Sequence, residues 1–426
     1  MTLIIFIVVL MLCIVIGLPI AFSLMITGIA LMLHLDFLDS QIMAQNLVKG
    51  INNFSLLAIP FFILAGEIMN VGGLSKRIID LPMKIVGHCK GGLGFVAILA
   101  AMIMASMSGS AVADTAAVGA MLFPMMKNAG YNHERSAGLI ASGGIIAPII
   151  PPSIPFIVFG VASGVSISKL FLAGIAPGLI IGITLCLVWY FISQKMDTAV
   201  LPKSSLKEIC RSFRQSFLAL LLPCIIIFGF KFGIFTPTEA GIVAAAYALF
   251  ISCFVYKEMT FKLLYEVLLA SCKTSAVVLL LVAAAQVSAW LMVIAELPNL
   301  VTDILEPFIE NKLLLMMIIM GITFIVGMVM DLTPAVLILC PVLMPVVHEA
   351  GIDPVYFGVL FIINLSIGLI TPPVGNVLNV IAGLTKLPFD RAVIGLLPYI
   401  SVLIAILILF IFVPQLITMP LSWILG

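Results

Sequence analysis

The chain has 426 residues, of which 63% are apolar and only 9% are charged, and its formal net charge is +1. This composition excludes a water-soluble protein, and it gives no reason to expect nucleic acid as a partner. Apolar runs of the length of a membrane-spanning helix, about 20 residues, recur along the chain, without the alternation of a membrane barrel. The sequence therefore predicts an all-α polytopic membrane protein.

One stretch of the chain occurs twice. Residues 108–178 align with residues 329–399 without a gap, which matches Pro124 with Pro345 and Gly174 with Gly395. Prolines inside apolar segments at matched positions are typical of secondary transporters, whose binding sites lie where two repeats meet. The sequence contains no GxxxxGK[ST] loop, so we expect no ATPase activity from this chain.

The first repeat is predicted over residues 1–193. Residues 2–34 could form either two helices or one long bent helix. The elements expected in chain order are apolar segments 2–16, 19–34 and 54–72, an amphipathic stretch 74–90, a hairpin 91–128, a proline-broken helix 133–165 and a last segment 168–193.

A charged linker is predicted over residues 194–214, and the second repeat over residues 215–426. The second repeat follows the order of the first. Its elements are apolar segments 215–233, 236–256 and 273–295, an amphipathic stretch 297–311, a hairpin 312–349, a broken helix 355–385 and a last segment 389–414.

The runs 91–128 and 312–349 are each too long for one span, because a helix of that length would measure about 55 Å against a membrane core of about 30 Å. Each run carries small or polar residues near its middle. We therefore favour re-entrant hairpins that enter and leave on one side, with two full spans as the alternative. Each half then crosses the membrane about five times, an odd number, so the halves form inverted repeats.

The distribution of positive charge supports this topology. One face of the membrane would carry the loops 74–90, 127–135, 194–214, 257–273 and 386–391. That face then holds every Lys and Arg except Lys49, Lys169, Lys231 and Lys312. Positive charge marks the cytoplasmic side, so we expect the linker to be cytoplasmic and both termini to be periplasmic.

Two carboxylates lie inside the hairpins, Asp114 and Asp331. A carboxylate at membrane depth is costly unless it faces protein, water or a cation. Each could cap a half-helix, but we favour the interpretation that each neutralises a bound cation. Oxygen ligands for a hard cation stand nearby: Ser108, Ser110 and Thr115 beside Asp114, and Thr333 beside Asp331.

The paired prolines of the two broken helices provide the opposing wall of the predicted site. Each pair removes two backbone donors, so the helix must open and leave carbonyl groups free. Pro148 and Thr371 are expected to offer oxygen atoms to cations. A half-helix N-terminus also favours an anion, so Ser110, Ser153, Thr371 and Asn376 are predicted to bind an anionic substrate. For Glu67 and Glu239, packing or capping is favoured over a part in transport.

Four motifs together resemble the large membrane subunit, or DctM-like M subunit, of tripartite ATP-independent periplasmic (TRAP) transporters. They are MSGSAVADTAAVG at 107–119, IIPPS at 149–153, GIFTPTEAG at 233–241 and ITPPVGN at 370–376. The resemblance implies a Na⁺-driven elevator carrier in a bacterial inner membrane. It maps the family's sodium sites onto Ser108, Asp114, Asp331 and Thr333.

The resemblance also implies two protein partners, a small four-helix membrane subunit and a periplasmic substrate-binding protein. Because the sequence begins within the region that resembles the large subunit, we expect a separate small subunit. The substrate would be an organic anion of the sialic acid or dicarboxylate type. The amino-acid sequence as a whole looks most similar to members that transport sialic acid.

Two other functions compete with this interpretation. A stand-alone Na⁺:carboxylate symporter would use the same architecture without a binding protein. An intramembrane aspartyl protease would need both carboxylates at one water. The second alternative is disfavoured, because Asp114 and Asp331 lie on hairpins inserted from opposite sides and no GxGD motif is present.

Overall fold

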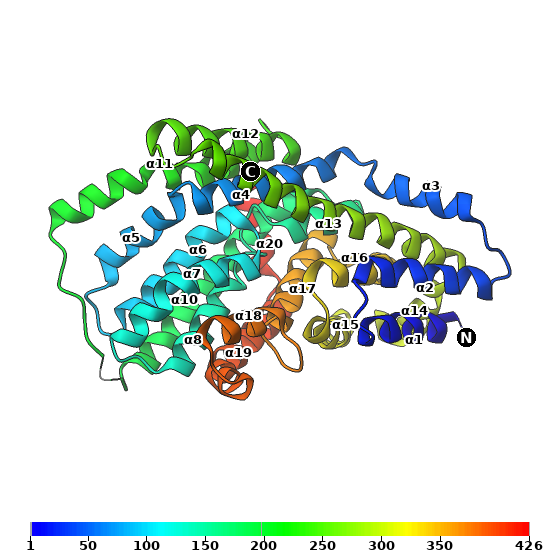
Figure 1. The fold of residues 1–426 in the computed structure, drawn as a ribbon. Helices are drawn as coiled ribbons and strands as arrows, with labels where there is room; N and C mark the ends of the chain where they lie inside the picture. Colours follow the sequence, from blue (N-terminus) through cyan, green and yellow to red (C-terminus); the bar gives the residue numbers. More distant parts are fainter. Residues whose placement is uncertain (1, 197, 426) are drawn as a thin grey trace.

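The computed structural model describes residues 2–196 and 198–425, which form helices and, within those ranges, no β-strand (Figure 1). The predicted all-α membrane fold is confirmed: eight of the described helical segments are long and apolar enough to cross a membrane. Residues 1, 197 and 426, which the predicted repeats and linker include, lie outside the described residues.

The first half contains the helices α1 (Thr2–Val15), α2 (Ile20–His34), α3 (Ser40–Ile51), η1 (Phe54–Leu57), α4 (Ala58–Val71), α5 (Leu74–Val86), α6 (Gly92–Ser108), α7 (Ala111–Asn128), α8 (His133–Gly144), α9 (Ile154–Ser163) and α10 (Ile167–Ser193). The second half contains α11 (Leu206–Lys231), α12 (Pro237–Phe250), η2 (Ile251–Val255), α13 (Phe261–Ile294), α14 (Leu297–Ile309), α15 (Lys312–Val329), α16 (Leu332–Glu349), α17 (Pro354–Gly368), α18 (Asn376–Thr385), α19 (Phe389–Phe412) and α20 (Gln415–Leu425).

Both predicted hairpins are helix pairs joined by two-residue turns. α6 and α7 meet at Gly109 and Ser110, and the φ of +62° at Gly109 is a left-handed conformation that glycine adopts without strain. α15 and α16 meet at Met330 and Asp331. Both turns line the same cavity, which is what we expect of re-entrant hairpins whose tips meet inside the protein.

The two predicted broken helices are also present. α8 and α9 are separated by the non-helical segment 145–153, and α17 and α18 by the segment 369–375. Both segments contain paired prolines, which have no N–H group to continue a helix.

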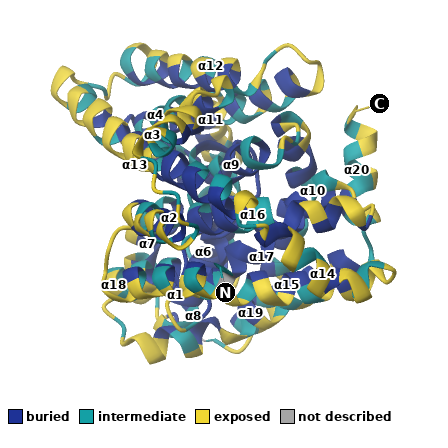
Figure 2. Cartoon of the chain, turned by 90° about the vertical axis from the view of Figure 1, so that its right-hand side faces the viewer, coloured by how far each residue is buried: buried dark blue, intermediate teal, exposed yellow. Residues whose placement is uncertain are grey.

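The helix contacts repeat when the two halves are exchanged. α9 packs on α16 of the second hairpin, and α18 packs on α7 of the first hairpin. In the same way, α8 contacts α19, and α17 contacts α10. Each broken helix therefore crosses to the hairpin of the other half, so the hairpins and broken helices form one interlocked body. Figure 2 shows that this central region, including α6, α9 and α17, is mostly buried, whereas α3, α11 and α12 expose much of their surface.

Two element boundaries differ from the sequence predictions. The linker was predicted over 194–214, but α11 already begins at Leu206, where Ser205 and Glu208 form a capping box. The long helix α13 also starts at Phe261, inside a stretch expected to be a cytoplasmic loop up to residue 273. The charged residues of 206–214 and 261–273 therefore lie on helices rather than in loops.

The N-terminal region contains one helix that was not predicted, and residues 2–34 form two helices rather than one. α1 and α2 are separate helices that pack on each other, so residues 2–34 are not one bent helix. The unpredicted helix is α3, which is followed by η1 and α4, and both α3 and α4 pack on α13. In the second half, the single helix α13 precedes the amphipathic helix α14. In the first half, the corresponding place before α5 is taken by three shorter helices, α3, η1 and α4.

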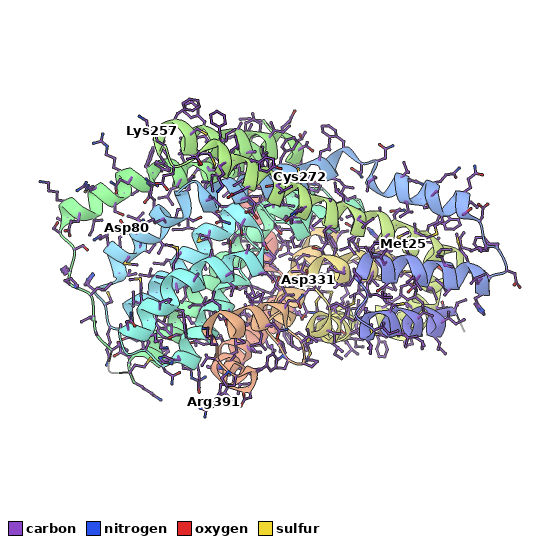
Figure 3. The ribbon with its side chains drawn as sticks, in the orientation of Figure 1. Met25, Asp80, Lys257, Cys272, Asp331 and Arg391 are labelled. Carbon is purple, nitrogen blue, oxygen red and sulfur yellow. The ribbon has the colours of Figure 1, made fainter. Side chains whose placement is uncertain are left out.

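The amphipathic helix α5 is fastened to its neighbours by polar contacts. Arg77 forms an ion pair of 2.7 Å with Glu258 and lies 3.8 Å from the centre of the Tyr256 ring. Ser212 of α11 donates a hydrogen bond of 2.7 Å to Asp80. In Figure 3, Lys257 lies near the upper edge of the molecule with Asp80 below it, Arg391 lies at the lower edge, and Asp331 lies near the middle. These contacts join α5 to α11 and to the segment before α13.

Candidate functional site

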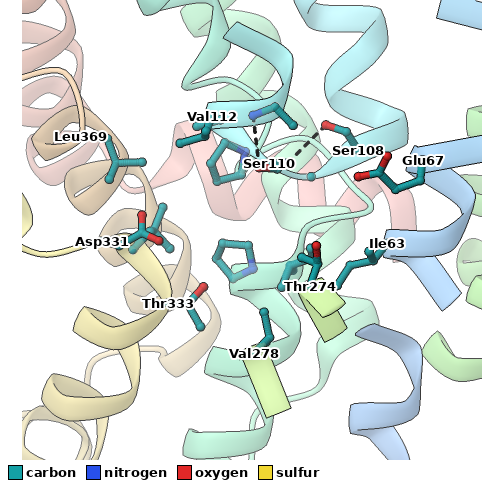
Figure 4. A pocket seen from close by; sticks show the side chains of 18 of the residues that line it. Ile63, Glu67, Ser108, Ser110, Val112, Thr274, Val278, Asp331, Thr333 and Leu369 are labelled. Carbon is teal, nitrogen blue, oxygen red and sulfur yellow. Dashed lines mark hydrogen bonds between the residues drawn. The ribbon is translucent and has the colours of Figure 1, made fainter. Parts of the chain in front are cut away.

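A cavity of about 400 Å³ lies where the two hairpin tips face helices α4 and α13 (Figure 4). We call the cavity-facing part of these two helices the α4–α13 wall, defined by Ile63, Gly66, Glu67, Asn70, Thr274 and Val278. The remaining lining residues are Ser108, Gly109, Ser110, Ala111, Val112 and Ala113 from the first tip, Asp331, Leu332 and Thr333 from the second tip, and Pro148, Ile154, Pro155 and Leu369 from the broken helices.

The first hairpin tip is organised around Asp114, which is 1% exposed. Ser108 donates a hydrogen bond to Asp114 Oδ1 across the turn, and the Ser110 N–H donates to Ser108 Oγ at 3.2 Å. The other carboxylate oxygen, Asp114 Oδ2, and the hydroxyl of Thr115 are buried without a hydrogen-bond partner in the described structure. Buried oxygen atoms without a donor suit a cation, because a cation supplies the missing positive charge.

The second hairpin tip presents its carboxylate differently. Asp331 is the residue before α16, its side chain makes no cap hydrogen bond, and it faces the cavity together with Thr333 (Figure 4). The repeat alignment matches Asp331 with Ser110, whereas Asp114 is matched with Ala335. The two carboxylates are thus not equivalent positions: one is buried behind a tip and the other lies at a tip.

The broken helices contribute less to the cavity than predicted. Pro148 lines it, but the carbonyl of Pro148 accepts a hydrogen bond of 2.5 Å from the fully buried Ser153, which also caps α9 at the N–H of Phe156. Thr371 donates to the carbonyl of Ile367 at 2.8 Å. Ser153, Thr371 and Asn376 are absent from the lining of this cavity, so their predicted contact with substrate stays a prediction that this conformation does not support.

Two polar residues of the cavity, Asn70 and Thr274, were not singled out by the sequence, and a third, Glu67, was assigned to packing or capping. Glu67 lies in the α4–α13 wall, and its side chain caps neither α4 nor α5. Glu239 does cap its helix, since it forms a capping box with Thr236. No sequence signal distinguished the two glutamates, because the repeat landmarks lie in the hairpins and broken helices and not in α4 or α13.

The electrostatic character of the cavity is unusual for a site that would hold an anion. Glu67 and Asp331 both line it, and no Lys or Arg is among the lining residues of the described structure. An organic anion would meet two carboxylates and no basic side chain there. Binding then requires positive charge from elsewhere, and the N-terminal turns of α7 and α16 together with bound cations can supply it.

The fold and the site define a membrane carrier built from two inverted repeats. Residues 7–416 match the family described as "Tripartite ATP-independent periplasmic transporter, DctM component", and the chain belongs to this family of transporters. The resemblance seen in the sequence is confirmed.

Three large permease proteins of this family are similar to the chain over nearly their whole length. A "Putative TRAP transporter large permease protein" of Haemophilus influenzae is 65% identical over 100% of both chains. The "2,3-diketo-L-gulonate TRAP transporter large permease protein YiaN" of Escherichia coli is 64% identical over 96% of both chains. The sialic acid permease protein SiaM of Vibrio cholerae is 39% identical over 94% of this chain and 93% of its own.

A solved structure has the same fold. The YdaH transporter of Alcanivorax borkumensis superposes with a TM-score of 0.65 over 91% of both chains at 14% sequence identity. At this identity the likeness shows the fold alone, which agrees with the all-helical transporter architecture.

Proposed function

We propose that this chain is the large permease subunit of a Na⁺-coupled importer for a sugar-derived organic acid. The observation that carries the proposal is one cavity at which both hairpin tips converge, with buried oxygen atoms at Asp114 and Thr115 that have no hydrogen-bond partner among the described residues. Na⁺ would be held by the side chains of Ser108, Asp114, Thr115, Asp331 and Thr333, and it would supply the positive charge that the cavity lining lacks.

An elevator movement suits the contacts of the cavity. The hairpins and broken helices interlock and would move as one body, while α4 and α13 pack on each other and would stay fixed. Gly66 of α4 lies under the first tip, where an added methyl group would come within 3.3 Å of the Ser108 Cα. A glycine at this crossing leaves a smooth surface along which the tip can slide.

For the substrate, we favour an acid of the 2,3-diketo-L-gulonate type. The relative named for this compound is 64% identical, whereas relatives named for sialic acid are 39% and 35% identical and one named for C4-dicarboxylates is 36% identical. Sialic acid, which the sequence favoured, is not confirmed. A lining rich in hydroxyl, amide and carboxylate groups also suits a polyhydroxylated acid.

Reconstitution tests the tripartite assignment against the stand-alone symporter. In proteoliposomes with an inward Na⁺ gradient, we expect little uptake of 2,3-diketo-L-gulonate by this chain alone. Adding the small four-helix membrane subunit and a loaded periplasmic binding protein should restore uptake, and replacing Na⁺ by choline should remove it. Full Na⁺-driven uptake by the chain alone, with the same KM when a binding protein is added, would instead establish the symporter.

Accessibility labelling tests the proposed orientation in the inner membrane. In a variant without the eight native cysteines, Cys placed at Ser204 should react only with membrane-permeant maleimides. Cys placed at Asn311 should react with impermeant maleimides added from the periplasmic side. Both positions lie outside the spans, in the linker and before α15. The opposite pattern would reverse the orientation, and labelling of both from one side would contradict the inverted repeat.

A further inference from the structure

We propose that Glu67 and Asn70, on the α4–α13 wall, recognise the hydroxyl-bearing end of the substrate. This inference rests on the proposed function and adds a specificity element to it. The two residues belong neither to the hairpins nor to the broken helices, which the cation sites occupy.

The first observation is the state of the Glu67 side chain. Glu67 is half-buried, it lines the cavity, and none of the described residues makes a hydrogen bond or an ion pair with its carboxylate. In Figure 4, Glu67 and Asp331 face the cavity from opposite sides. A carboxylate that is partly withdrawn from water and has no protein partner gains most from a ligand that donates hydrogen bonds. The hydroxyl groups of a sugar acid are such donors.

The second observation is that Asn70 is held in place beside Glu67. Ser75 donates a hydrogen bond of 2.9 Å to Asn70 Oδ1. With its oxygen engaged, the amide group keeps its NH₂ end for another partner. Asn70 and Glu67 lie one helical turn apart on α4 and therefore point to the same side of the helix. Together they offer a strong acceptor and a donor, which is the pair needed to bind a hydroxyl group.

The negative charge of Glu67 determines which end of the substrate can face the α4–α13 wall. The carboxylate of an organic acid is repelled by Glu67, so it must point away from the α4–α13 wall. On the tip side, Ala111 and Val112 begin α7 and line the cavity, and their N–H groups have no acceptor in the described structure. The substrate carboxylate would lie toward this helix N-terminus and the bound cations, with the hydroxyl-bearing end against Glu67, Asn70 and Thr274.

A comparison of two ligands tests the inference. The purified complex of this chain with its small subunit is titrated, in saturating Na⁺, with 2,3-diketo-L-gulonate or with 2,3-dioxohexanoate, which keeps the carboxylate and both ketones but has no hydroxyl group. The half-saturating concentration is read from ligand-induced thermal stabilisation. The wild type should prefer the hydroxylated ligand by about tenfold or more, because hydrogen bonds to a charged group are worth that factor.

Glu67→Ala should lose most of this preference by weakening only the hydroxylated ligand, and Asn70→Ala should lose part of it. Glu67→Gln, which can still accept a hydrogen bond, should fall between Glu67→Ala and the wild type. The matched control Glu306→Ala, at an exposed carboxylate of α14, should behave as the wild type. An unchanged preference in Glu67→Ala, or equal weakening of both ligands, overturns the inference while the proposed function stands. Absence of Na⁺-dependent binding of either ligand to the wild type overturns both.

Discussion

Asp114→Ala is expected to abolish Na⁺-dependent uptake by the reconstituted complex. Asp114 carries the full negative charge behind the first tip, and its second oxygen has no donor in the part of the chain that the structure describes. Without that charge, the remaining hydroxyl and carbonyl groups around the tip would have to hold Na⁺ alone. The loss should exceed about a hundredfold in uptake rate at physiological Na⁺, since removing one partner of a buried charge pair costs about 3–5 kcal/mol.

Asp114→Asn removes the negative charge but keeps the hydrogen bond, so it tests the charge without disturbing the fold. The amide oxygen of Asn can still accept the hydrogen bond from Ser108, so the tip should keep its geometry and the protein its amount in the membrane. Uptake should be lost nonetheless. Asp303→Asn, at an exposed position of α14, is the matched control and should transport normally.

Asp331→Ala is expected to stop uptake too, but with a smaller effect on thermal stability. The Asp331 side chain makes no cap hydrogen bond and faces the cavity, so its removal leaves no buried donor unpaired. Uptake and unfolding temperature are measured on the same preparations. If both alanine variants keep more than half of the wild-type rate at saturating Na⁺, neither carboxylate takes part in the mechanism.

The sequence predicted the parts of the fold that carry repeated landmarks. The hairpins followed from two apolar runs too long for one span, and the broken helices followed from paired prolines at matched positions. Both depend on local properties, helix length and the missing proline N–H group, which hold whatever the surroundings. The side chains of Ser108, Ser110, Asp331 and Thr333 accordingly line one cavity, and Asp114 lies directly behind the first tip.

What the sequence could not predict depends on contacts between distant segments. Ser153 was predicted to meet substrate, but its hydroxyl is used within its own break, on the Pro148 carbonyl. Glu67 could not be told from a capping residue, because its exposure to the cavity is set by the packing of α4 beside α13 and the first tip. The polar helix α3 lies between residues 34 and 54, where the apolar pattern predicted no element. Its packing on α13, where Gly50 lies against Gln286, stabilises it as a helix.

The crossing of α8 and α19 is one of the contacts that join the two halves, and Gly395 of α19 lies there against the backbone of Glu134 of α8. A methyl group at Gly395 would lie 2.1 Å from the Glu134 carbonyl oxygen and 2.6 Å from its carbon, atoms of a helix backbone that cannot turn aside. Polar contacts hold the two helices together there. Arg391 pairs with Glu134 at 2.8 Å, and Arg135 donates to the carbonyl of Ile394 at 3.0 Å.

Gly395→Ala should therefore force α8 and α19 apart and lower the unfolding temperature of the detergent-solubilised protein by about 1–3 °C, since overpacking costs about 1–3 kcal/mol. The matched variant Gly174→Ala should behave alike, because its methyl group would lie 2.2 Å from the Ile149 carbonyl oxygen. Gly383→Ala is the control: nothing lies within 4 Å of its added methyl group. Alanine favours a helix over glycine, so this control should unfold at or above the wild-type temperature. Equal unfolding temperatures for all three variants would show that α8 and α19 are not held at this distance.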